Sequence, residues 1–326
     1  MKEAIIRMLK ECDGHISGQQ LCDNFGVSRT AVWKVIKQLQ KEGYEIEAVR
    51  NKGYHLVKSG DVMTEAEIKS CIKGTTIGRQ VAYYEETDST NTRAKYLAEQ
   101  GAEEGTLVIA ERQNAGKGRR GKNWTSPPGS GIWMSIVLRP DILPFQASML
   151  TLVAAMGVFE GIYQETGLEP QIKWPNDLVL SGKKICGILT EMTTELDTIQ
   201  YVVIGIGVNV NIESFPQELS QTATSLYLES GEKKKRSPLV GAIAKAFEQY
   251  YHKFLAVKNL SLLKQQYESH LANQNRQVTV MSPNGQYSGI CLGINEQGEL
   301  LVEKNDGQIC QVLSGEVSVR GIYGYV

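Results

Sequence analysis

NAGKGRRGKNWTSPPGSG, residues 114–131, first suggests a dinucleotide-binding fold and then excludes it. Three of its glycines have the spacing of the dinucleotide fingerprint: Gly116, Gly118 and Gly121. In a Rossmann fold such a turn leads directly into a helix whose N-terminus holds the pyrophosphate. Here Pro127-Pro128 and two further glycines follow, which exclude a helix. The next predicted element is a strand over residues 132–138, so the fingerprint is a false match.

The same stretch carries four cations within six residues: Lys117, Arg119, Arg120 and Lys122. Its glycines allow backbone N–H groups to approach an anion closely. Arginine and lysine neutralise the charge that develops during phosphoryl or nucleotidyl transfer. We therefore interpret residues 116–121 as a cationic loop that closes over a bound anion. A solvated hairpin tip is the alternative, and the sequence contains no Walker GxxxxGK[ST] motif.

Composition limits the class of protein. The chain has 326 residues, 41% of them hydrophobic, enough for two or three domains with sizeable cores. Its six cysteines form no Cys-x-x-Cys pair and show no metal-binding spacing with histidine, so we expect reduced thiols in a cytoplasmic protein and no metal site. The N-terminus has no signal-peptide pattern. The longest apolar stretch, MLTLVAAMGVFEGIY, is interrupted by Glu160 and is expected to be too short to cross a membrane.

Residues 1–60 differ from the rest in charge. They hold ten Lys/Arg and seven Asp/Glu, a net charge of +3, whereas the whole chain has a net charge of −1. After a first helix, a second is predicted to begin at a Ser17 cap, and a third to follow a Ser28 cap and end at Gly43. The tight turn FGVS between them predicts a helix-turn-helix. Two strands around the basic turn at residues 50–53 complete a winged helix.

The third predicted helix has a polar face suited to DNA, which carries Arg29, Thr30, Trp33, Lys34 and Lys37. We expect these side chains to enter a major groove, while Arg50 and Lys52 of the wing contact phosphates. A solvated basic helix in an interaction module is the alternative. Because a single winged helix covers one half-site, specific binding implies a dimer.

Residues 65–270 alternate between buried strands and polar segments. The predicted strands are VAYYEET, GTLVIAERQ, residues 172–174, residues 185–189 and YVVIGIGVNVNI. Asp177 and Lys184 border two of these strands, where a buried charge requires a partner or a ligand. The polar segment ESFPQELSQTATSL follows the last strand and is expected to cover a pocket.

The C-terminal segment alternates with period two. Asn284-Gly285 and Asp306-Gly307 predict hairpin turns, and Gln297-Gly298 predicts another. Five short strands suggest an SH3-like barrel. A structural cap is one interpretation of this barrel; Arg320, near the end of its last strand, is a candidate to reach the active site.

Five segments in a fixed order carry a resemblance: DSTN, ERQNAGKGRRGKNWTSP, KWPND, GKKICGIL and GIGVNVN. The chain resembles the biotin–protein ligases over nearly its whole length, and in particular the bifunctional type that is also the biotin operon repressor. The resemblance implies an α/β (α+β) multidomain fold with three parts. These are a winged helix-turn-helix DNA-binding domain (1–62), a mixed-sheet, class II synthetase-like domain for biotin and ATP (63–270), and an SH3-like domain (271–326), which in the family helps to recognise ATP and acceptor.

The resemblance also implies a two-step reaction. Biotin's carboxylate attacks the α-phosphate of ATP, with Mg²⁺ neutralising the phosphates, and gives biotinoyl-5′-AMP and pyrophosphate. A lysine amine of a biotin carboxyl carrier domain then attacks the acyl carbon. The cationic loop fits this chemistry because it compensates the charge of a carboxylate that approaches a polyanion, and it shields the mixed anhydride from water.

Site residues follow from the matching positions. Those implied for biotin are Ser89, Thr90, Asn91, Gln113, Lys117, Gly118, Arg119 and Lys184. Those implied for ATP or the adenylate are Arg119, Arg120, Trp124, Asn176, Asn209 and Asn211, and the segment 211–226 is expected to fold over adenine. Catalysis is assigned to Lys184, Arg119 and Asp177. Lys117 stands where the family has arginine, which weakens the case for a bidentate contact and leaves a backbone contact.

Three roles stay open at this point. Ser89 contacts the ureido ring of biotin, caps a helix, or does both. Trp124 packs on biotin or on the core. Asp177 orients the acceptor amine, accepts its proton, or has a structural role.

A DNA-binding domain on a ligase suggests regulation. We hypothesise that the adenylate orders loops that form a dimer surface, that the dimer binds a two-fold operator, and that the carrier protein competes for the same surface. Three alternatives remain: a ligase whose winged helix does not regulate, a lipoate–protein ligase, and a ligand-sensing transcription factor without catalysis.

Overall fold

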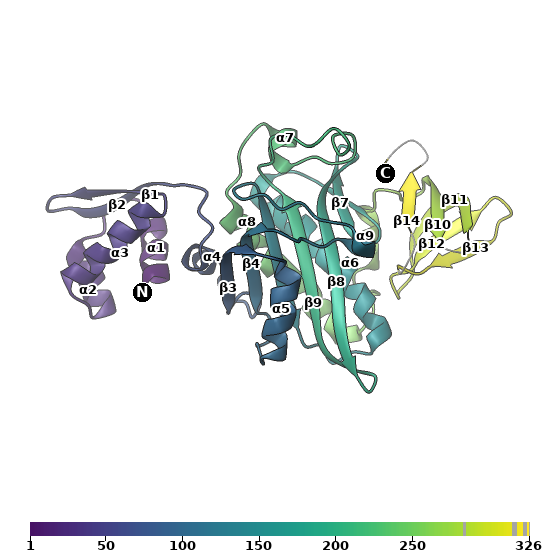
Figure 1. The fold of residues 1–326 in the computed structure, drawn as a ribbon, viewed down its shortest axis with the longest axis horizontal. Coiled ribbons are helices and arrows are strands. Elements are labelled where there is room, and N and C mark those ends of the chain that lie inside the picture. Colours follow the sequence, from purple (N-terminus) through teal and green to yellow (C-terminus); the bar gives the residue numbers. More distant parts are fainter. Residues whose placement is uncertain (283–284, 315–317, 322–324, 326) are drawn as a thin grey trace.

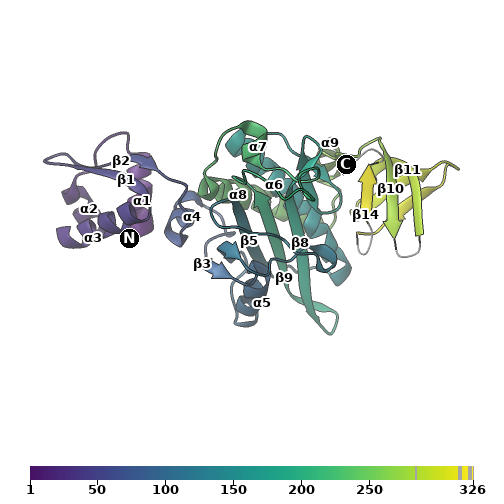
Figure 2. The same ribbon diagram turned by 45° about the horizontal axis from the view of Figure 1, so that its top comes forward.

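The computed structural model of the chain describes residues 1–282, 285–314, 318–321 and 325. Three units follow one another along the longest axis: a helical unit with a hairpin, a central sheet with helices, and a C-terminal sheet (Figure 1). Both views place α4 (Glu65–Cys71) between the first unit and the central sheet (Figure 2). The expected α/β multidomain fold is confirmed.

The first unit is the predicted winged helix. Its elements are α1 (Lys2–Glu11), α2 (Gly18–Phe25), α3 (Arg29–Lys41), β1 (Tyr44–Val49) and β2 (Gly53–Ser59). Ser17 and Gln20 form a capping box at the start of α2, and Gly26 ends α2 in the left-handed conformation. Ser28 caps α3 by accepting the N–H of Ala31. The antiparallel pair β1–β2 forms the wing.

The winged helix has an apolar core of its own. One cluster joins its three helices and the wing. The α3 members of this cluster are Val32, Val35, Ile36 and Leu39, the stripe that the helical spacing predicts. The polar side chains of α3 therefore face solvent.

Seven strands form the central sheet. In chain order they are β3 (Val81–Thr87), β4 (Leu107–Gln113), β5 (Gly131–Leu138), β6 (Gln171–Lys173), β7 (Asp177–Leu180), β8 (Lys183–Glu195) and β9 (Thr198–Asn209). Across the sheet their order is β3-β4-β5-β9-β8-β7-β6. The pair β3–β4 is parallel and the other neighbours are antiparallel, so the sheet is mixed, as expected.

Helices cover both faces of this sheet. α6 (Met149–Thr166) and α8 (Arg236–Val257) pack on each other on one face, and α5 (Thr90–Glu99) covers the other. A Cβ added at Gly157 of α6 would lie 2.7 Å from the Cα of Phe247, so glycine is what allows the two helices to approach. Two short helices complete the unit: α7 (Leu226–Ser230) and α9 (Lys264–Ser269).

The core helix α6 corrects one expectation. Together with the 3₁₀ turn before it, the helix spans Pro144–Thr166, and these 23 residues are long and apolar enough to cross a membrane. The expectation that the stretch is too short is therefore wrong. However, 72% of its apolar window is buried inside the protein, as in a helix at the centre of a globular domain.

Five strands form the C-terminal sheet: β10 (Gln277–Ser282), β11 (Gly285–Ile294), β12 (Leu300–Lys304), β13 (Ile309–Val312) and β14 (Ser318–Gly321). The sheet is antiparallel with the order β13-β12-β11-β10-β14. Gly298 and Gly307 have positive φ in two of the three predicted turns. The turn predicted at Asn284-Gly285 lies partly outside the described residues, and so does the side chain of Arg320.

Candidate active site

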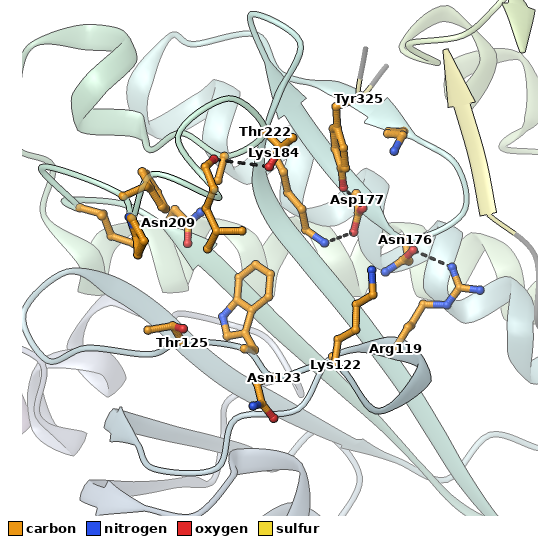
Figure 3. A pocket seen from close by; sticks show the side chains of 18 of the residues that line it. Arg119, Lys122, Asn123, Thr125, Asn176, Asp177, Lys184, Asn209, Thr222 and Tyr325 are labelled. Atoms are coloured by element: carbon orange, nitrogen blue, oxygen red, sulfur yellow. Dashed lines mark hydrogen bonds and ion pairs between the residues drawn. The ribbon is translucent and has the colours of Figure 1, made fainter. Parts of the chain in front are cut away.

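Two adjoining cavities lie where β4 and β9 end and β7 and β8 begin. The larger has a volume of about 420 Å³ and the smaller of about 50 Å³, and both are lined by Gly118, Arg119, Trp124, Asn176 and Lys184. The smaller is also lined by Ser89, Thr90, Asn91, Gln113 and Lys117. The larger is also lined by Arg120, Asp177 and Asn209 (Figure 3). The structure thus brings the predicted site residues together around one divided site, with a single exception described below.

Trp124 forms the wall between the two cavities. Gly187 of β8 is paired with Gly207 of β9, and Cβ atoms added there would lie 2.9 Å and 2.5 Å from the indole. Only glycine leaves room for the ring at both positions. Trp133 meets the ring edge-on at a centroid distance of 6.4 Å, and Lys184 Nζ lies 5.1 Å from its centroid. Trp124 packs on the sheet and also faces both cavities. Packing on the core and contact with a ligand, the two roles left open for it, are therefore compatible.

Neutral hydrogen-bonding groups line the small cavity. Gln113 accepts the N–H of Thr90 (2.7 Å) and donates to Ser126 Oγ (2.7 Å). The buried Ser135 Oγ donates to Asn91 Oδ1 (2.6 Å) and lies 2.8 Å from Thr90 Oγ1. These side chains fix one another, which holds donors and acceptors in place for an uncharged polar ring.

An ion pair supports this network from outside. Asn91 Nδ2 donates to Glu191 Oε2 (2.7 Å), and Lys95 forms an ion pair with Glu191. Burial raises the pKa of Glu191, but the hydrogen bonds from Lys95 and Asn91 outweigh it, so its pKa lies below the usual 4.5. The ionised carboxylate fixes the orientation of the Asn91 amide, because only the NH₂ group can donate to it.

Ser89 is not a side-chain cap of α5. It precedes the helix, but its hydroxyl makes no capping hydrogen bond within the described part of the chain. Gln113 serves this end instead, because its Oε1 accepts the N–H of Thr90. Ser89 is buried and lines the small cavity, which leaves the ligand role open and removes the capping role.

Lys184 and Asp177 form an ion pair of 2.5 Å where the two cavities meet (Figure 3). The phenol of Tyr325 donates to the other oxygen of Asp177. Lys173 Nζ lies 3.4 Å from the centre of the Tyr325 ring. The neighbouring Lys183 instead donates to a backbone carbonyl at 3.2 Å, so Lys184 is the lysine directed into the site.

The cationic loop folds as a closed turn. The N–H of Gly118 donates to the carbonyl of Lys122 (2.7 Å), and Arg120 has a left-handed backbone with φ of 58°. Lys117 Nζ donates to Thr92 Oγ1 at 3.2 Å. The loop is thus held by its own backbone and by the start of α5, with its cations beside both cavities.

Arg119 connects three parts of the site. Its guanidinium donates to Asn176 Oδ1 (2.8 Å) and to the carbonyl of Ser314 in the C-terminal unit (2.6 Å). Burial lowers the pKa of Arg119, and the charge of Asp177 opposes this shift. Since an arginine stays protonated in proteins, the result is a fixed positive charge at the junction of the cavities.

Residues 212–225 form a roof over the larger cavity. The N–H of Lys184 donates to the carbonyl of Thr222 (2.8 Å), and the N–H of Thr224 donates to the carbonyl of Lys184 (2.9 Å). Phe215 and Leu219 line the cavity from this segment. The prediction that the polar segment covers a pocket is confirmed.

Asn211 lies outside both cavities, so the structure gives no support to its prediction as a nucleotide contact. Its amide donates to the carbonyl of Lys234 (2.9 Å) and accepts the N–H of the same residue (2.9 Å). It also donates to Asp61 Oδ2 at 3.3 Å. These bonds use both ends of the amide, so Asn211 is held in place where the roof segment begins.

The side chains predicted to contact DNA are exposed. On α3 these are Arg29, Thr30, Trp33, Lys34 and Lys37, and at the wing they are Arg50 and Lys52. Trp33 is 52% exposed, which is unusual for a tryptophan and fits a helix that meets a partner surface. Arg29 donates to Gln19 of α2 at 2.9 Å, which ties its guanidinium to the first helix of the motif.

The sequence reasoning missed four residues of the site. Ser135 and Glu191 support the hydrogen-bond network of the small cavity, and Lys173 and Tyr325 lie beside Asp177. Lys173 had a signal, because a lysine inside the apolar run before Pro175 is unusual. The other three had none, since each acts through a contact with a distant segment.

Three family models match the chain. They are the Biotin/lipoate A/B protein ligase family over residues 83–209, the HTH domain over residues 2–55, and the Biotin protein ligase C terminal domain over residues 275–320. The chain is 43% identical to the bifunctional ligase/repressor BirA of Bacillus subtilis, over 93% of this chain and 94% of that protein. It is 31% identical to the bifunctional ligase/repressor BirA of Escherichia coli, over 97% and 96%.

A solved structure agrees. The biotin protein ligase from Aquifex aeolicus in complex with biotin and ATP has a TM-score of 0.66 and 31% identity, and covers 74% of this chain and 99% of its own. The fold and the divided site define an enzyme of the adenylate-forming ligase class. The chain belongs to the biotin–protein ligase family, in the bifunctional type that combines ligase and repressor. The resemblance carried by the five sequence segments is confirmed.

Proposed function

We propose that this protein joins biotin to a lysine of a biotin carboxyl carrier domain in two steps through biotinoyl-AMP, and that it represses transcription at an operator. The divided cavity carries the proposal. A small compartment with a wall of neutral hydrogen-bonding side chains meets a large cationic one at Lys184 and Arg119. The ureido ring of biotin suits the small compartment and MgATP suits the large one, with Asn176 and Asn209 at its nucleotide and metal end.

In the first half-reaction, a carboxylate oxygen of biotin bonds to the α-phosphorus and the bond to pyrophosphate breaks. Two anions have to meet, and the charges of Lys184 and Arg119 lie where their repulsion is greatest. Arg119 is already held by Asn176 and by the Ser314 carbonyl, so its charge needs little reorganisation. Binding the two substrates on either side of Trp124 positions the carboxylate for attack.

In the second half-reaction, the acceptor amine bonds to the acyl carbon, AMP departs, and the nitrogen loses a proton. Asp177 lies at the same junction, 2.5 Å from Lys184 Nζ. We assign it the orientation of the incoming lysine or the receipt of its proton. When Lys184 turns to the phosphate of the bound adenylate, the Asp177 carboxylate becomes free for this role before AMP departs.

The regulatory part of the proposal concerns oligomers. The adenylate orders the cationic loop and the roof, the ordered form dimerises, and the dimer places two α3 helices on a two-fold operator. Carrier protein and second subunit compete for one surface. Domains at residues 1–62, 63–270 and 271–326, and a cytoplasmic location, belong to the same proposal.

The test is biotin-dependent exchange of labelled pyrophosphate into ATP, with lipoate as the control acid. Exchange with biotin alone supports the proposal, and exchange with lipoate alone makes the protein a lipoate ligase. Exchange with neither favours a ligand-sensing transcription factor. Sedimentation with and without adenylate separates a regulatory ligase from one whose winged helix does not regulate, since the latter shows no change in association.

A further inference from the structure

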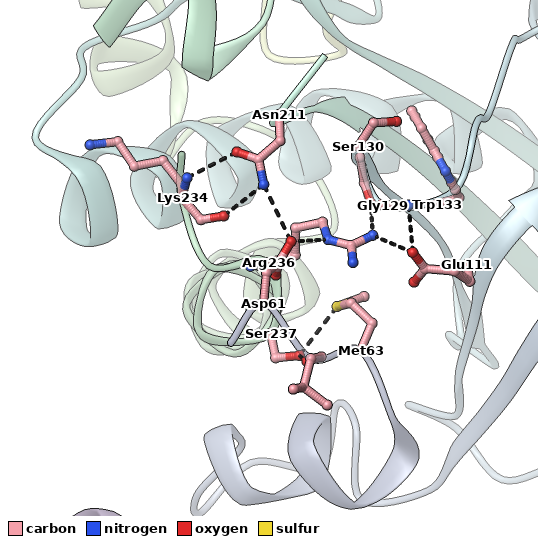
Figure 4. A network of polar contacts seen from close by, with 12 residues as sticks. Asp61, Met63, Glu111, Gly129, Ser130, Trp133, Asn211, Lys234, Arg236 and Ser237 are labelled. Carbon is pink, nitrogen blue, oxygen red and sulfur yellow. Dashed lines mark hydrogen bonds and ion pairs between the residues drawn. The ribbon is translucent and has the colours of Figure 1, made fainter. Parts of the chain in front are cut away.

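Arg236 is a buried arginine that the proposed reaction does not use (Figure 4). Its side chain is 4% exposed and lines neither cavity. It forms ion pairs with Asp61, in the segment that leaves the winged helix, and with Glu111 of β4. A buried charge is stable only with well-placed partners, so removing one of these carboxylates affects what the others hold.

One side of this network closes the loop of residues 114–130. Arg236 Nη1 donates to Glu111 Oε1 (3.0 Å) and to the carbonyl of Gly131 (3.3 Å). The same Glu111 oxygen accepts the N–H of Gly129 at 2.5 Å. Glu111 lies before the loop, and Gly129 and Gly131 lie at its C-terminal end, so Arg236 links the two ends of the loop. This loop carries the cations and the indole of the active site.

The other side of the network holds Asn211, at the start of the roof segment. Asp61 Oδ2 accepts from Arg236 Nε (2.6 Å) and from Asn211 Nδ2 (3.3 Å), and Asn211 is the last residue before the roof. Asp61 Oδ1 accepts the backbone N–H of Arg236 at 2.8 Å. The carboxylate therefore also lies at the N-terminus of α8, where unpaired N–H groups and the helix dipole favour a negative charge.

The segment around Asp61 is hydrogen-bonded to the start of α8 on both sides of this residue. Lys235 Nζ donates to Ser59 Oγ (2.7 Å), and Ser237 Oγ donates to the carbonyl of Val62 (2.6 Å). Ser59 is the last residue of the wing strand β2. A displacement of the wing that moves residues 59–62 would therefore also move the Asp61 carboxylate. This carboxylate is bonded to Arg236, which links the ends of the loop of residues 114–130, and to Asn211, where the roof begins.

We propose that Asp61 is a positioning residue for the adenylate site and the physical coupling between that site and the DNA-binding domain. The inference rests on the proposed function. Asp61 touches no substrate and acts through Arg236 and Asn211. Coupling is reciprocal: an adenylate that orders both loops strengthens their hold on Asp61 and restricts the wing, and a DNA-bound wing favours the ordered loops.

The test uses the full-length protein with Asp61→Asn, which keeps the size of the side chain and removes its charge. We expect biotinoyl-AMP to leave this variant at least about fivefold faster than wild type, the lower end of usual coupling effects. We also expect a smaller adenylate-induced gain in affinity for a DNA duplex that the wild type selects from a random library. Glu11→Gln is the matched control, because it removes an exposed ion pair between α1 and Lys73, away from the loops.

The inference is overturned if Asp61→Asn releases biotinoyl-AMP at the wild-type rate and shows the wild-type gain in DNA affinity on binding the adenylate. A variant that only unfolds at lower temperature, with wild-type release well below that temperature, has lost a structural contact and also overturns it. If Asp61→Asn does not fold, Asn211→Ala removes only the contact between Asp61 and the start of the roof. Release of biotinoyl-AMP at the wild-type rate by Asn211→Ala would also overturn the inference. Wild-type protein that retains no adenylate overturns the proposed function, and the inference with it.

Discussion

A methyl group added at Gly207 tests whether Trp124 is the wall of the site. In Gly207→Ala the new Cβ would lie 2.5 Å from Trp124 Nε1 and 2.6 Å from its Cε2. Non-bonded heavy atoms need about 3.5 Å, so the ring has to move by about 1 Å. Such overpacking costs about 1–3 kcal/mol, and a displacement of about 1 Å in an active site can lower the rate about 100-fold.

The assay is pyrophosphate exchange as a function of biotin and of ATP. We expect kcat/KM for both substrates to fall about 10- to 100-fold in Gly207→Ala, because the indole faces both cavities. Gly205→Ala is the companion variant: its Cβ would meet Asn91 Oδ1 at 2.2 Å, so it should raise the KM for biotin and leave that for ATP. Gly14→Ala, with no atom within 4 Å, is the control. A folded Gly207→Ala enzyme with wild-type kinetics would refute the role of the wall.

Three further predictions follow from single side chains. Arg119→Gly removes the bonds to Asn176 and to the C-terminal unit, so it should weaken retention of biotinoyl-AMP more than its synthesis, and the adenylate should appear in the medium in a filtration assay; retention equal to wild type would contradict this role. Glu191 has a lowered pKa, so it stabilises the folded state above its ordinary pKa of 4.5, and this contribution is lost as the pH falls through its folded value. Denaturant unfolding over a pH series should therefore show a flatter acid limb in Glu191→Gln than in wild type, and equal limbs would exclude the effect. Lys37→Ala should weaken DNA binding across sequences and lower the slope of log affinity against log salt by about 1, whereas an unchanged slope would place Lys37 away from phosphate.

Local sequence signals predicted local structure well. Ser17, Ser28 and Gly26 mark helix ends through hydrogen bonds within a few residues, and the structure has each helix end there. The proline pair after the cationic loop excluded a helix for the same kind of reason. Family motifs placed the site residues within short segments whose backbone is fixed by the sheet.

Contacts between distant segments could not be predicted in this way. Asn211 follows a matching motif, yet its amide bonds to Asp61 and Lys234, and nothing near it in the sequence indicates either partner. Tyr325 reaches Asp177 from 148 residues further along the chain. Arg236 is the first residue of α8, and only the tertiary structure shows that its charge is buried between two units.

The order of strands across the central sheet sets the order in which the sheet can assemble. β6, β7, β8 and β9 are neighbours both along the chain and across the sheet, so they pair through short turns at a small entropic cost. β5 pairs with β9 only after the long segment that contains α6 has been placed. We therefore expect the β6–β9 meander to fold early, with Asp177, Lys184 and the glycine pair already on it. The side chains that line the small cavity and the cationic loop join only when β3–β5 dock, so ligand affinity during refolding should report on the last step of sheet assembly.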